Sequence, residues 1–530
     1  MVFKAQLFAL SGVQPSRQKV MVKGAVVKDD TWGDIKMRDG MMLLMMGSAE
    51  ELPTVPTEEE QPMFVEDMTP EQLAAKMDLP PGLANLGNTC YINATIQCLK
   101  TVPELKEALV NLNCSSSCQF QMITECCVVP AVRDLFVSLD IVSNSFPPVV
   151  LLSVLDKFFP QFSEKNEDGI HYQQDANEFW TEVVRCLQRQ LVATEADEAI
   201  ASQGAVGFQR SFIDRYFAGQ FAITMKCIEC EDEPVTTTAE SFYQFSCFIQ
   251  KEVKYLHTGL QSRMQETITK HSTVLSRDAK FLKTCKLSRL PAYLTIQMVR
   301  FFYKEKEGVN AKILKDVKFP MSLDVFDLCS EEVKKKLTRM RDRFRKDDEV
   351  KAAQKAKSPV FQEKEKALNK MDKDEEEEEE KPVLFREPFS FPDDIGSNNS
   401  GYYELQAVLT HKGRSSVSGH YVAWTRKKGD EWVMFDDHRV SPVTAADVQK
   451  LSGGGDWHCA YVLLYGPRVL EREATQEEIA EMEAEELRIE EERRKEEERK
   501  NAPGNGPLAR LYKERKEKER REKEGQEEMK

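Results

Sequence analysis

The sequence predicts a two-lobed α+β fold, because helical patterns fill the first half of its largest unit and strand patterns fill the second. Ile92, Ile96 and Leu99 recur at the spacing of one helix face. The stretch 176–191 contains neither proline nor glycine, which favours a second helix. β-branched and aromatic residues are concentrated in four later segments: 293–303, 402–409, 420–425 and 431–435. A helical half followed by a sheet half fits an α+β protein with a cleft between two lobes.

Three breaks in composition divide the 530-residue chain. Glu, Pro and Thr dominate the first, and we place a linker at 51–77. The second, at about 331–381, has many charges and few large apolar side chains, which predicts a mostly disordered insertion with some solvated helix. The third, 468–530, predicts a charged tail that is helical or disordered. The remaining units are 1–50 and 78–467.

Charge and composition exclude several classes of protein. The net charge of −15 argues against a general nucleic-acid binder, which needs surplus Lys and Arg for phosphates. The most apolar run, 41–46, is far shorter than the ~20 residues that span a bilayer, so we expect no membrane association. The 13 cysteines are irregularly spaced and no secretory signal is expected. We therefore predict a soluble cytoplasmic protein with reduced thiols, and leave a nuclear location open.

The segment 82–99 contains the residues best suited to nucleophilic catalysis. Its glycines and asparagines predict a tight loop, and the apolar helix pattern begins directly after it. Asn88 or Thr89 can cap this helix, which places Cys90 in its first turn. Helix N–H groups and the helix dipole favour a thiolate there and supply donors for an oxyanion, with the Asn85 side chain as a further donor. Taken alone, Cys90 is more simply explained as a small buried apolar residue.

A second segment supplies a base for this nucleophile. Residues 420–436 predict a β-hairpin, and a three-residue turn at 427–429 would place His420 directly opposite Asp436. Cross-strand neighbours lie about 5 Å apart, so the carboxylate would orient the imidazole. A one-residue slip would present Asp437 instead. Each residue alone has a simple structural explanation, but together with a cysteine at a helix start they form a nucleophile, a base and an orienting group.

The chain resembles the ubiquitin-specific proteases over the whole of 78–467. The segment 82–99 resembles the cysteine box of that family, and 419–437 resembles its histidine box. Two further stretches, 173–179 and 290–303, also resemble this family, and all four occur in the family's order. Three others are similar to the proteasome-associated members in particular: 64–68, 394–399 and 451–457.

This resemblance implies a papain-like core with thumb, palm and fingers, and hydrolysis of the isopeptide bond after the C-terminal glycine of ubiquitin without a cofactor. Cys90 would attack the carbonyl carbon. His420 would accept the thiol proton and then protonate the leaving lysine amine, while Asp436 would hold the imidazole. Asn85 would help to stabilise the oxyanion.

The resemblance also implies that Gln173 and Asp175 lie near the ubiquitin tail, where a carboxylate suits the arginines of that tail. The alternative for Asp175 is that it caps the helix that begins at Ala176.

Residues 1–50 resemble part of a ubiquitin-like β-grasp domain. A helix pattern at 2–10 precedes strand patterns at 18–22 and 41–46. A complete ubiquitin fold opens with a β-hairpin before its helix, so the first hairpin is missing and a sheet edge would be bare. In the family this domain docks on the proteasome. The expected partners are therefore ubiquitin, ubiquitinated proteins and the 26S proteasome, with proteasome docking in question because of the missing hairpin.

Cys227 and Cys230 have the spacing of half a zinc site. Only single cysteines follow them, the first at Cys247 and Cys285, with no second C-x-x-C. Structural zinc needs four ligands, so we predict no metal.

The sequence thus favours a thiol-dependent deubiquitinase that trims ubiquitin from proteasome-bound proteins. Two alternatives stay open: a non-catalytic, ubiquitin-binding regulator of the proteasome, and a protease for another ubiquitin-like modifier. The presence of Cys90, His420 and Asp436 argues against an idle centre. We further hypothesise that the loop 412–419 moves aside for the ubiquitin tail, which would make activity depend on a partner.

Overall fold

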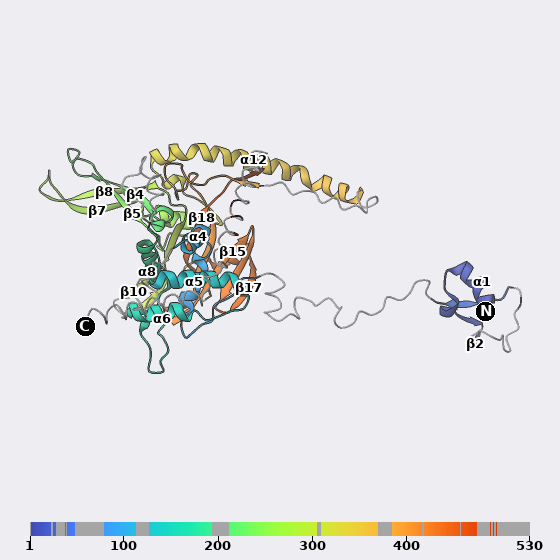
Figure 1. Cartoon of the computed structure of the whole chain (residues 1–530). Coiled ribbons are helices and arrows are strands. Elements are labelled where there is room, and N and C mark those ends of the chain that lie inside the picture. The colour runs from blue at the N-terminus through green and yellow to red at the C-terminus, as the bar shows by residue number, and fades with distance from the viewer. Residues whose placement is uncertain are drawn as a thin grey trace, which may run out of the picture. The chain divides into compact units, whose positions relative to one another are not determined.

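A computed structural model of the chain separates two compact units, Met1–Thr69 and Pro70–Lys530, and each is described by itself (Figure 1). The structure describes residues 2–22, 25–27, 38, 40–47, 79–112, 127–192, 211–304, 309–368, 384–415, 418–455, 457–473, 488, 491 and 494. The predicted linker, the end of the insertion and most of the predicted tail lie outside these residues. No helix of the described part is both long and apolar enough to cross a membrane.

The N-terminal unit packs one helix on a small antiparallel sheet of order β2-β1-β3. Val20, Val22 and Val27 form its core, and Phe3 and Leu7 of the helix pack against them. The predicted helix and both predicted strands are confirmed. The assignment to a β-grasp domain stays a prediction. The elements are α1 Val2–Ser11, η1 Pro15–Arg17, β1 Lys19–Val22, β2 Ala25–Val26 and β3 Leu44–Met46.

The first half of the large unit is helical, as predicted. Its central helix is α3, in which every residue from Cys90 to Leu99 is buried. Tyr91 of α3 meets the rings of Phe162 and Phe179 at centroid distances of 5.9 and 5.4 Å. The helices are α3 Cys90–Leu99, α4 Pro103–Val110, α5 Val128–Ile141, α6 Val149–Phe158, α7 Pro160–Ser163, α8 Ala176–Gln190 and α10 Phe212–Tyr216.

The second half is built on an eight-stranded sheet with the path β17-β16-β15-β14-β18-β9-β6, to which β12 adds beside β14. Side chains alternate between the two faces of each strand, so each face of the sheet packs against a separate hydrophobic core. On β15, Tyr421 and Ala423 pack with the helices, whereas Val422 and Trp424 pack into the core on the other face. The strands are β6 Phe245–Phe248, β9 Leu294–Val299, β12 Ser322–Asp324, β14 Tyr402–Ser415, β15 Ser418–Lys428, β16 Glu431–Asp436, β17 Arg439–Thr444 and β18 Cys459–Pro467.

Arg300 interrupts the predicted strand 293–303, and its side chain bonds to three separate segments of the sheet half. Its side chain is fully buried. The guanidinium donates hydrogen bonds of 2.7–3.0 Å to four backbone carbonyls, those of Ile313, Lys315, Ser452 and Ala460. The chain resumes as a ribbon of β10 Phe301–Lys304 and β11 Val309–Lys312.

A separate four-stranded sheet of order β5-β4-β8-β7 extends away from the main body of the large unit (Figure 1). Cys227 is buried here with Phe281, and Cys230 packs beside them. Cys247 lies in the different core of β6. The strands are β4 Gly219–Cys227, β5 Thr236–Phe242, β7 Gln265–Ser272 and β8 Arg277–Arg289.

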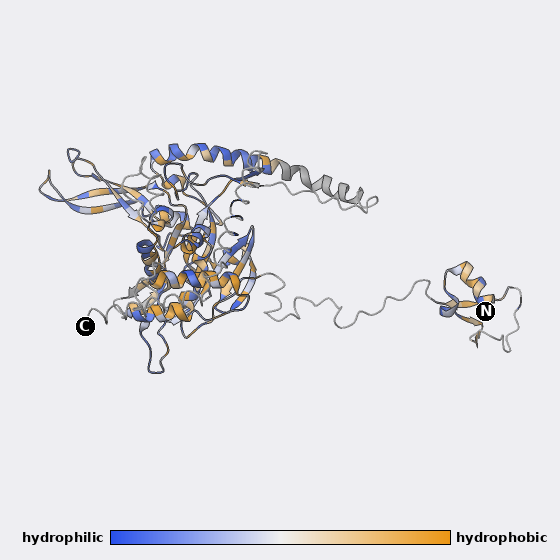
Figure 2. Ribbon diagram, viewed as in Figure 1, coloured by the Kyte–Doolittle hydropathy of each residue, from blue (hydrophilic) through white to orange (hydrophobic). Residues whose placement is uncertain are grey.

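The charged insertion forms a helix, α12 Glu331–Leu368, which corrects the expectation that most of it is disordered. Leu337 and Phe344 are buried, and the guanidinium of Arg341 stacks on the ring of Phe326 at 4.4 Å. Apolar residues spaced four, three and four apart anchor one face of the helix, while its outer face is hydrophilic (Figure 2). Residues 369–383 lie outside the described part.

The predicted tail also needs correction at its start, because the folded unit continues past residue 467. Leu470 is buried, and β19 Glu471–Glu473 pairs with β13 Leu384–Arg386. The sheet half is completed by short helices, namely α11 Leu256–Gln261, η5 Phe326–Leu328, α13 Ala445–Gln449 and η6 Lys450–Ser452.

Candidate active site

Cys90 opens helix α3, as the sequence predicts, and its side chain points at the sheet. Its Sγ accepts a hydrogen bond of 3.5 Å from the backbone N–H of Tyr421 on β15. Thr89 occupies the N-cap position, but its hydroxyl does not cap the helix. That hydroxyl instead accepts from the N–H of Leu86 and so closes the preceding loop. The nucleophile is therefore held between the helical half and the sheet half.

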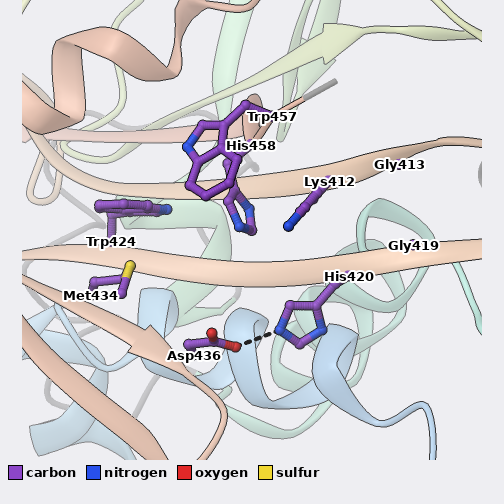
Figure 3. A pocket seen from close by; sticks show the side chains of 9 residues that line it. All are labelled: Lys412, Gly413, Gly419, His420, Trp424, Met434, Asp436, Trp457 and His458. Carbon is purple, nitrogen blue, oxygen red and sulfur yellow. Dashed lines mark hydrogen bonds and ion pairs between the residues drawn. The ribbon is translucent and has the colours of Figure 1, made fainter. Parts of the chain in front are cut away.

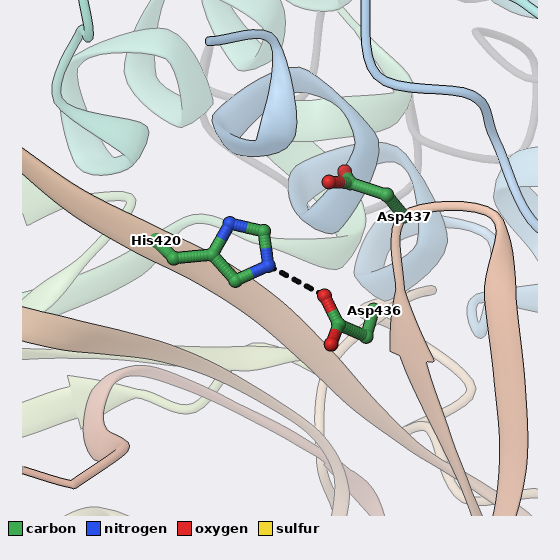
Figure 4. A group of neighbouring side chains, drawn as sticks. All are labelled: His420, Asp436 and Asp437. Atoms are coloured by element: carbon green, nitrogen blue, oxygen red, sulfur yellow. Dashed lines mark hydrogen bonds and ion pairs between the residues drawn. The ribbon is translucent and has the colours of Figure 1, made fainter.

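His420 and Asp436 form the expected pair, although not through the predicted register (Figure 4). The His420 Nε2 lies 2.5 Å from Asp436 Oδ1. The hairpin turns at residues 429–430, and a bulge lies between Arg426 and Lys428. Continuing this register places Val422, rather than His420, opposite Asp436. The offset of two residues keeps His420 and Asp436 on one face as diagonal neighbours, so the imidazole still reaches the carboxylate.

The electrostatics of the pair favour a protonated imidazole. The hydrogen bond that His420 donates to the Asp436 carboxylate, reinforced by one with the Cys90 side chain, raises the pKa of His420 from 6.5 to about 10. The same bond lowers the pKa of Asp436. His420 can therefore hold the proton taken from the thiol while the acyl bond forms, and then pass it to the leaving amine.

Asp437 organises the loop that carries the nucleophile, a role that the sequence reasoning missed. One carboxylate oxygen accepts from Asn85 Nδ2 at 2.9 Å, and the other accepts from Asn93 Nδ2 at 2.8 Å. The loop packs so closely here that a Cβ on Gly82 would lie 2.5 Å from the Asp437 carbonyl oxygen. The sequence signal for this role was an unusual number of asparagines around Cys90, because buried asparagine side chains need hydrogen-bond acceptors.

Asn85 is held in place on both sides of its amide. Its Oδ1 accepts from the N–H groups of Gly87 and Thr89, at 2.9 and 3.1 Å. An amide nitrogen carries two N–H groups, and Asp437 uses one of them. The other is available for an oxyanion, so the predicted role of Asn85 is compatible with its position and stays a prediction.

Gln173 contacts the nucleophile, and Asp175 links helix α8 to strand β18. The Gln173 Nε2 donates to Cys90 Sγ at 3.4 Å. Asp175 caps α8 by accepting from the N–H of Asn177, which confirms the alternative reading of this residue, and it also accepts from the Tyr461 hydroxyl. Its contact with a ubiquitin tail stays a prediction.

The cluster of His420, Asp436 and Asp437 has the composition of a metal site, with its ligand atoms within 4.8 Å of one another. Each group already has a hydrogen-bond partner: His420 pairs with Asp436, and Asp437 accepts from two asparagines. Hydrogen bonds within the catalytic centre thus account for the cluster without an ion.

Such a centre performs acyl transfer through a thiol, which places the protein in the class of cysteine proteases. The chain belongs to the family described as "Ubiquitin carboxyl-terminal hydrolase", whose model matches residues 81–465. It is therefore a deubiquitinating enzyme with the predicted α+β protease fold.

Curated relatives agree over most of the chain. Ubiquitin carboxyl-terminal hydrolase 6 of Arabidopsis thaliana is 40% identical over 88% of this chain and 94% of the relative. Ubiquitin carboxyl-terminal hydrolase 14 of Caenorhabditis elegans is 39% identical over 89% and 90%. A solved structure of the SAGA Ubp8/Sgf11/Sus1/Sgf73 DUB module bound to ubiquitin aldehyde is matched at 20% identity and a TM-score of 0.47, over 73% of this chain and 69% of that one.

The pairing of His420 with Asp436 predicts how the activity depends on pH. Asp436→Asn is expected to move the alkaline limb of the kcat/KM profile to lower pH by about one unit or more. The carboxylate makes the largest contribution to the raised pKa of His420, so its loss lowers that pKa and the imidazolium disappears earlier as pH rises. The measurement is the pH profile for ubiquitin linked to a fluorogenic amine. Asp430→Asn, in the exposed turn of the same hairpin, is the control, and an unmoved limb in Asp436→Asn would contradict the assignment.

Proposed function

We propose that this deubiquitinase trims ubiquitin from proteins held at the proteasome. The observation that carries the proposal is the complete centre of Cys90, His420 and Asp436, which favours hydrolysis over a purely scaffolding role. The resemblance of residues 1–50 to the domain that docks on the proteasome in this family supports the location. We also propose a cytoplasmic location, because the described cysteines are free thiols and the cytoplasm keeps thiols reduced.

The N-terminal unit offers a surface for this docking. Met42, Leu44 and Met46 are all exposed, and the last two project from β3 at alternate positions. Exposed apolar side chains grouped in this way are typical of protein-binding surfaces. A charge on β3 should therefore weaken binding to the proteasome without touching the catalytic centre.

The test is reaction with ubiquitin that carries an electrophilic C-terminus, with and without 26S proteasomes. We expect adduct formation to be about fivefold faster or more with proteasomes, a typical size for coupling between two sites. Cys90→Ala should form no adduct in either condition. The double variant Leu44→Asp, Met46→Asp should lose the acceleration, whereas Gln6→Asp on the exposed surface of α1 should keep it.

Equal rates with and without proteasomes would contradict the proposed location of action while leaving the hydrolase itself in place. They would also contradict the hypothesis that the loop 412–419 must be moved by a partner. Residues 416–417 of that loop lie outside the described part.

A further inference from the structure

A pocket of about 500 Å³ adjoins the catalytic pair on the side away from the helices. Trp457 and Lys412 lie on one side of it, and His420 with Asp436 lies on the other (Figure 3). We call it the acceptor pocket, and its further walls are the side chains of Trp424, Met434 and His458.

The acceptor pocket and the predicted site for the ubiquitin tail lie on opposite faces of the ribbon that β14 and β15 form. The rings of His411 and Tyr421 are in contact on the face toward the helices, with centroids 4.7 Å apart and planes tilted by 57°. Tyr421 also lies beside the bond between Tyr461 and Asp175. Lys412 and His420, which pair across the ribbon, belong to the other face. His420 therefore separates the side where the tail is expected from the acceptor pocket.

The reaction determines on which side of His420 the leaving lysine lies. When the tail carbonyl is attacked by Cys90, the bond between that carbonyl carbon and the lysine nitrogen breaks, and His420 delivers its proton to the nitrogen. The leaving lysine must then lie beside His420 on the side opposite the tail. The residues next to this lysine are the part of the substrate that can reach the pocket.

The side chains that line the acceptor pocket determine which chemical groups can bind in it. Trp457 is 62% exposed, and the Lys412 ammonium lies 4.7 Å from the centroid of its indole. Lys412 forms no ion pair with any carboxylate in the described part of the chain, and the Asp436 carboxylate is bonded to His420. Burial lowers the pKa of His458 to about 4, so its ring is neutral near pH 7. The pocket thus offers an aromatic wall and, at Lys412, a cation with no carboxylate partner among the described residues.

We propose that the acceptor pocket binds the substrate segment that flanks the ubiquitinated lysine, with a preference for an acidic residue beside that lysine. The proposal rests on the deubiquitinase activity of the same centre. An apolar stem against Trp457 and a carboxylate on Lys412 would satisfy both walls at once. Trp457 and Lys412 become specificity-determining residues for the protein from which ubiquitin is removed.

The test compares three ubiquitin substrates with the full-length chain. One carries a small fluorogenic amine, and two carry a short peptide joined through its lysine, with glutamates or with lysines at the flanking positions. The readout is the kcat/KM for each peptide substrate divided by that for the fluorogenic substrate. This ratio reports on the acceptor side alone, because all three substrates share the ubiquitin side and the catalytic centre.

We expect the wild-type chain to prefer the glutamate peptide. Trp457→Ala should lower the ratio for this peptide by about tenfold, a common loss when one aromatic contact residue is truncated. Lys412→Glu should reverse the preference between the two peptides. Lys428→Glu, an exposed lysine at the hairpin end outside the pocket, is the matched control and should leave both ratios unchanged.

Unchanged ratios in both pocket variants would overturn the proposal, since the acceptor segment would then bind elsewhere. Retention of the glutamate preference in Lys412→Glu would overturn the acidic preference. A wild-type chain that releases no fluorogenic amine, alone or with proteasomes, would overturn the activity of the centre and the pocket proposal with it. The two failures are therefore distinguishable.

Discussion

The variant His420→Gln is expected to lower kcat/KM for ubiquitin hydrolysis by about 10³- to 10⁴-fold, with little change in ubiquitin binding. His420 serves twice, first as the base for the Cys90 thiol and then as the acid for the leaving amine, and a glutamine side chain can do neither. Among the residues that the structure describes, only the His420 imidazole bonds to both Cys90 and Asp436. Steady-state kinetics with ubiquitin linked to a fluorogenic amine, together with a binding titration, measure the two quantities.

A matched control is available in the four-stranded sheet. His271 is exposed on β7, and its ring lies 3.6 Å from the Asp278 carboxylate, so it also has a histidine–aspartate pair. His271→Gln should retain wild-type kinetics. If His420→Gln kept more than about a tenth of the activity, the assignment of base and acid would be wrong.

The second large effect concerns stability. Arg300→Met is expected to destabilise the large unit by about 3–5 kcal/mol, because four carbonyls lose a charged donor and the apolar side chain replaces none of those bonds. The carbonyls belong to separate segments, so the short helix η6, which ends at Ser452, should loosen first. The measurement is the midpoint of urea unfolding followed by tryptophan fluorescence.

Arg345→Met provides the comparison for this change. Arg345 lies on the exposed face of α12, and its partners Asp342 and Glu349 are also exposed. Exposed ion pairs of this kind contribute about 0–1 kcal/mol. Equal midpoints for Arg300→Met and Arg345→Met would show that the buried guanidinium does not fasten the sheet half.

Much of the fold was predictable because its signals are local. The helix 176–190 contains no proline or glycine, the strands β14 and β16 begin at the predicted residues 402 and 431, and β15 begins at Ser418, two residues before the predicted start. The strand 293–303 was predicted as continuous, but Arg300 breaks it. Two of the four carbonyls that bond this buried arginine belong to residues more than 150 positions away, which no local pattern contains.

The site was predictable in its residue types and less so in its geometry. Cys90 and His420 follow from their segments, whereas the hairpin register depends on a bulge at Lys427 that propensity does not reveal. The offset of two residues preserved the face, so Asp436 was still identified. The sequence offers Asp437 only as a substitute for Asp436, because the bonds of Asp437 to Asn85 and Asn93 cross more than 340 positions.

The insertion was mispredicted for a different reason. Its high charge density predicts disorder, whereas the spacing of four apolar residues follows one helix face, namely Val333, Leu337, Met340 and Phe344. A few buried side chains were enough to anchor the first turns of α12 on the sheet half. Periodicity is therefore a better guide than charge density in such segments.

The separation of the catalytic partners along the chain has a consequence for synthesis on the ribosome. The sulfur of Cys90 contacts Tyr421, which lies 331 positions later. At about 10 residues per second, the nucleophile emerges roughly half a minute before its base. During that interval α3 lacks β14 and β15, the strands that cover it. The nascent chain is consequently unable to cleave ubiquitin, and its exposed apolar helices are natural clients for a chaperone until the last strands are made.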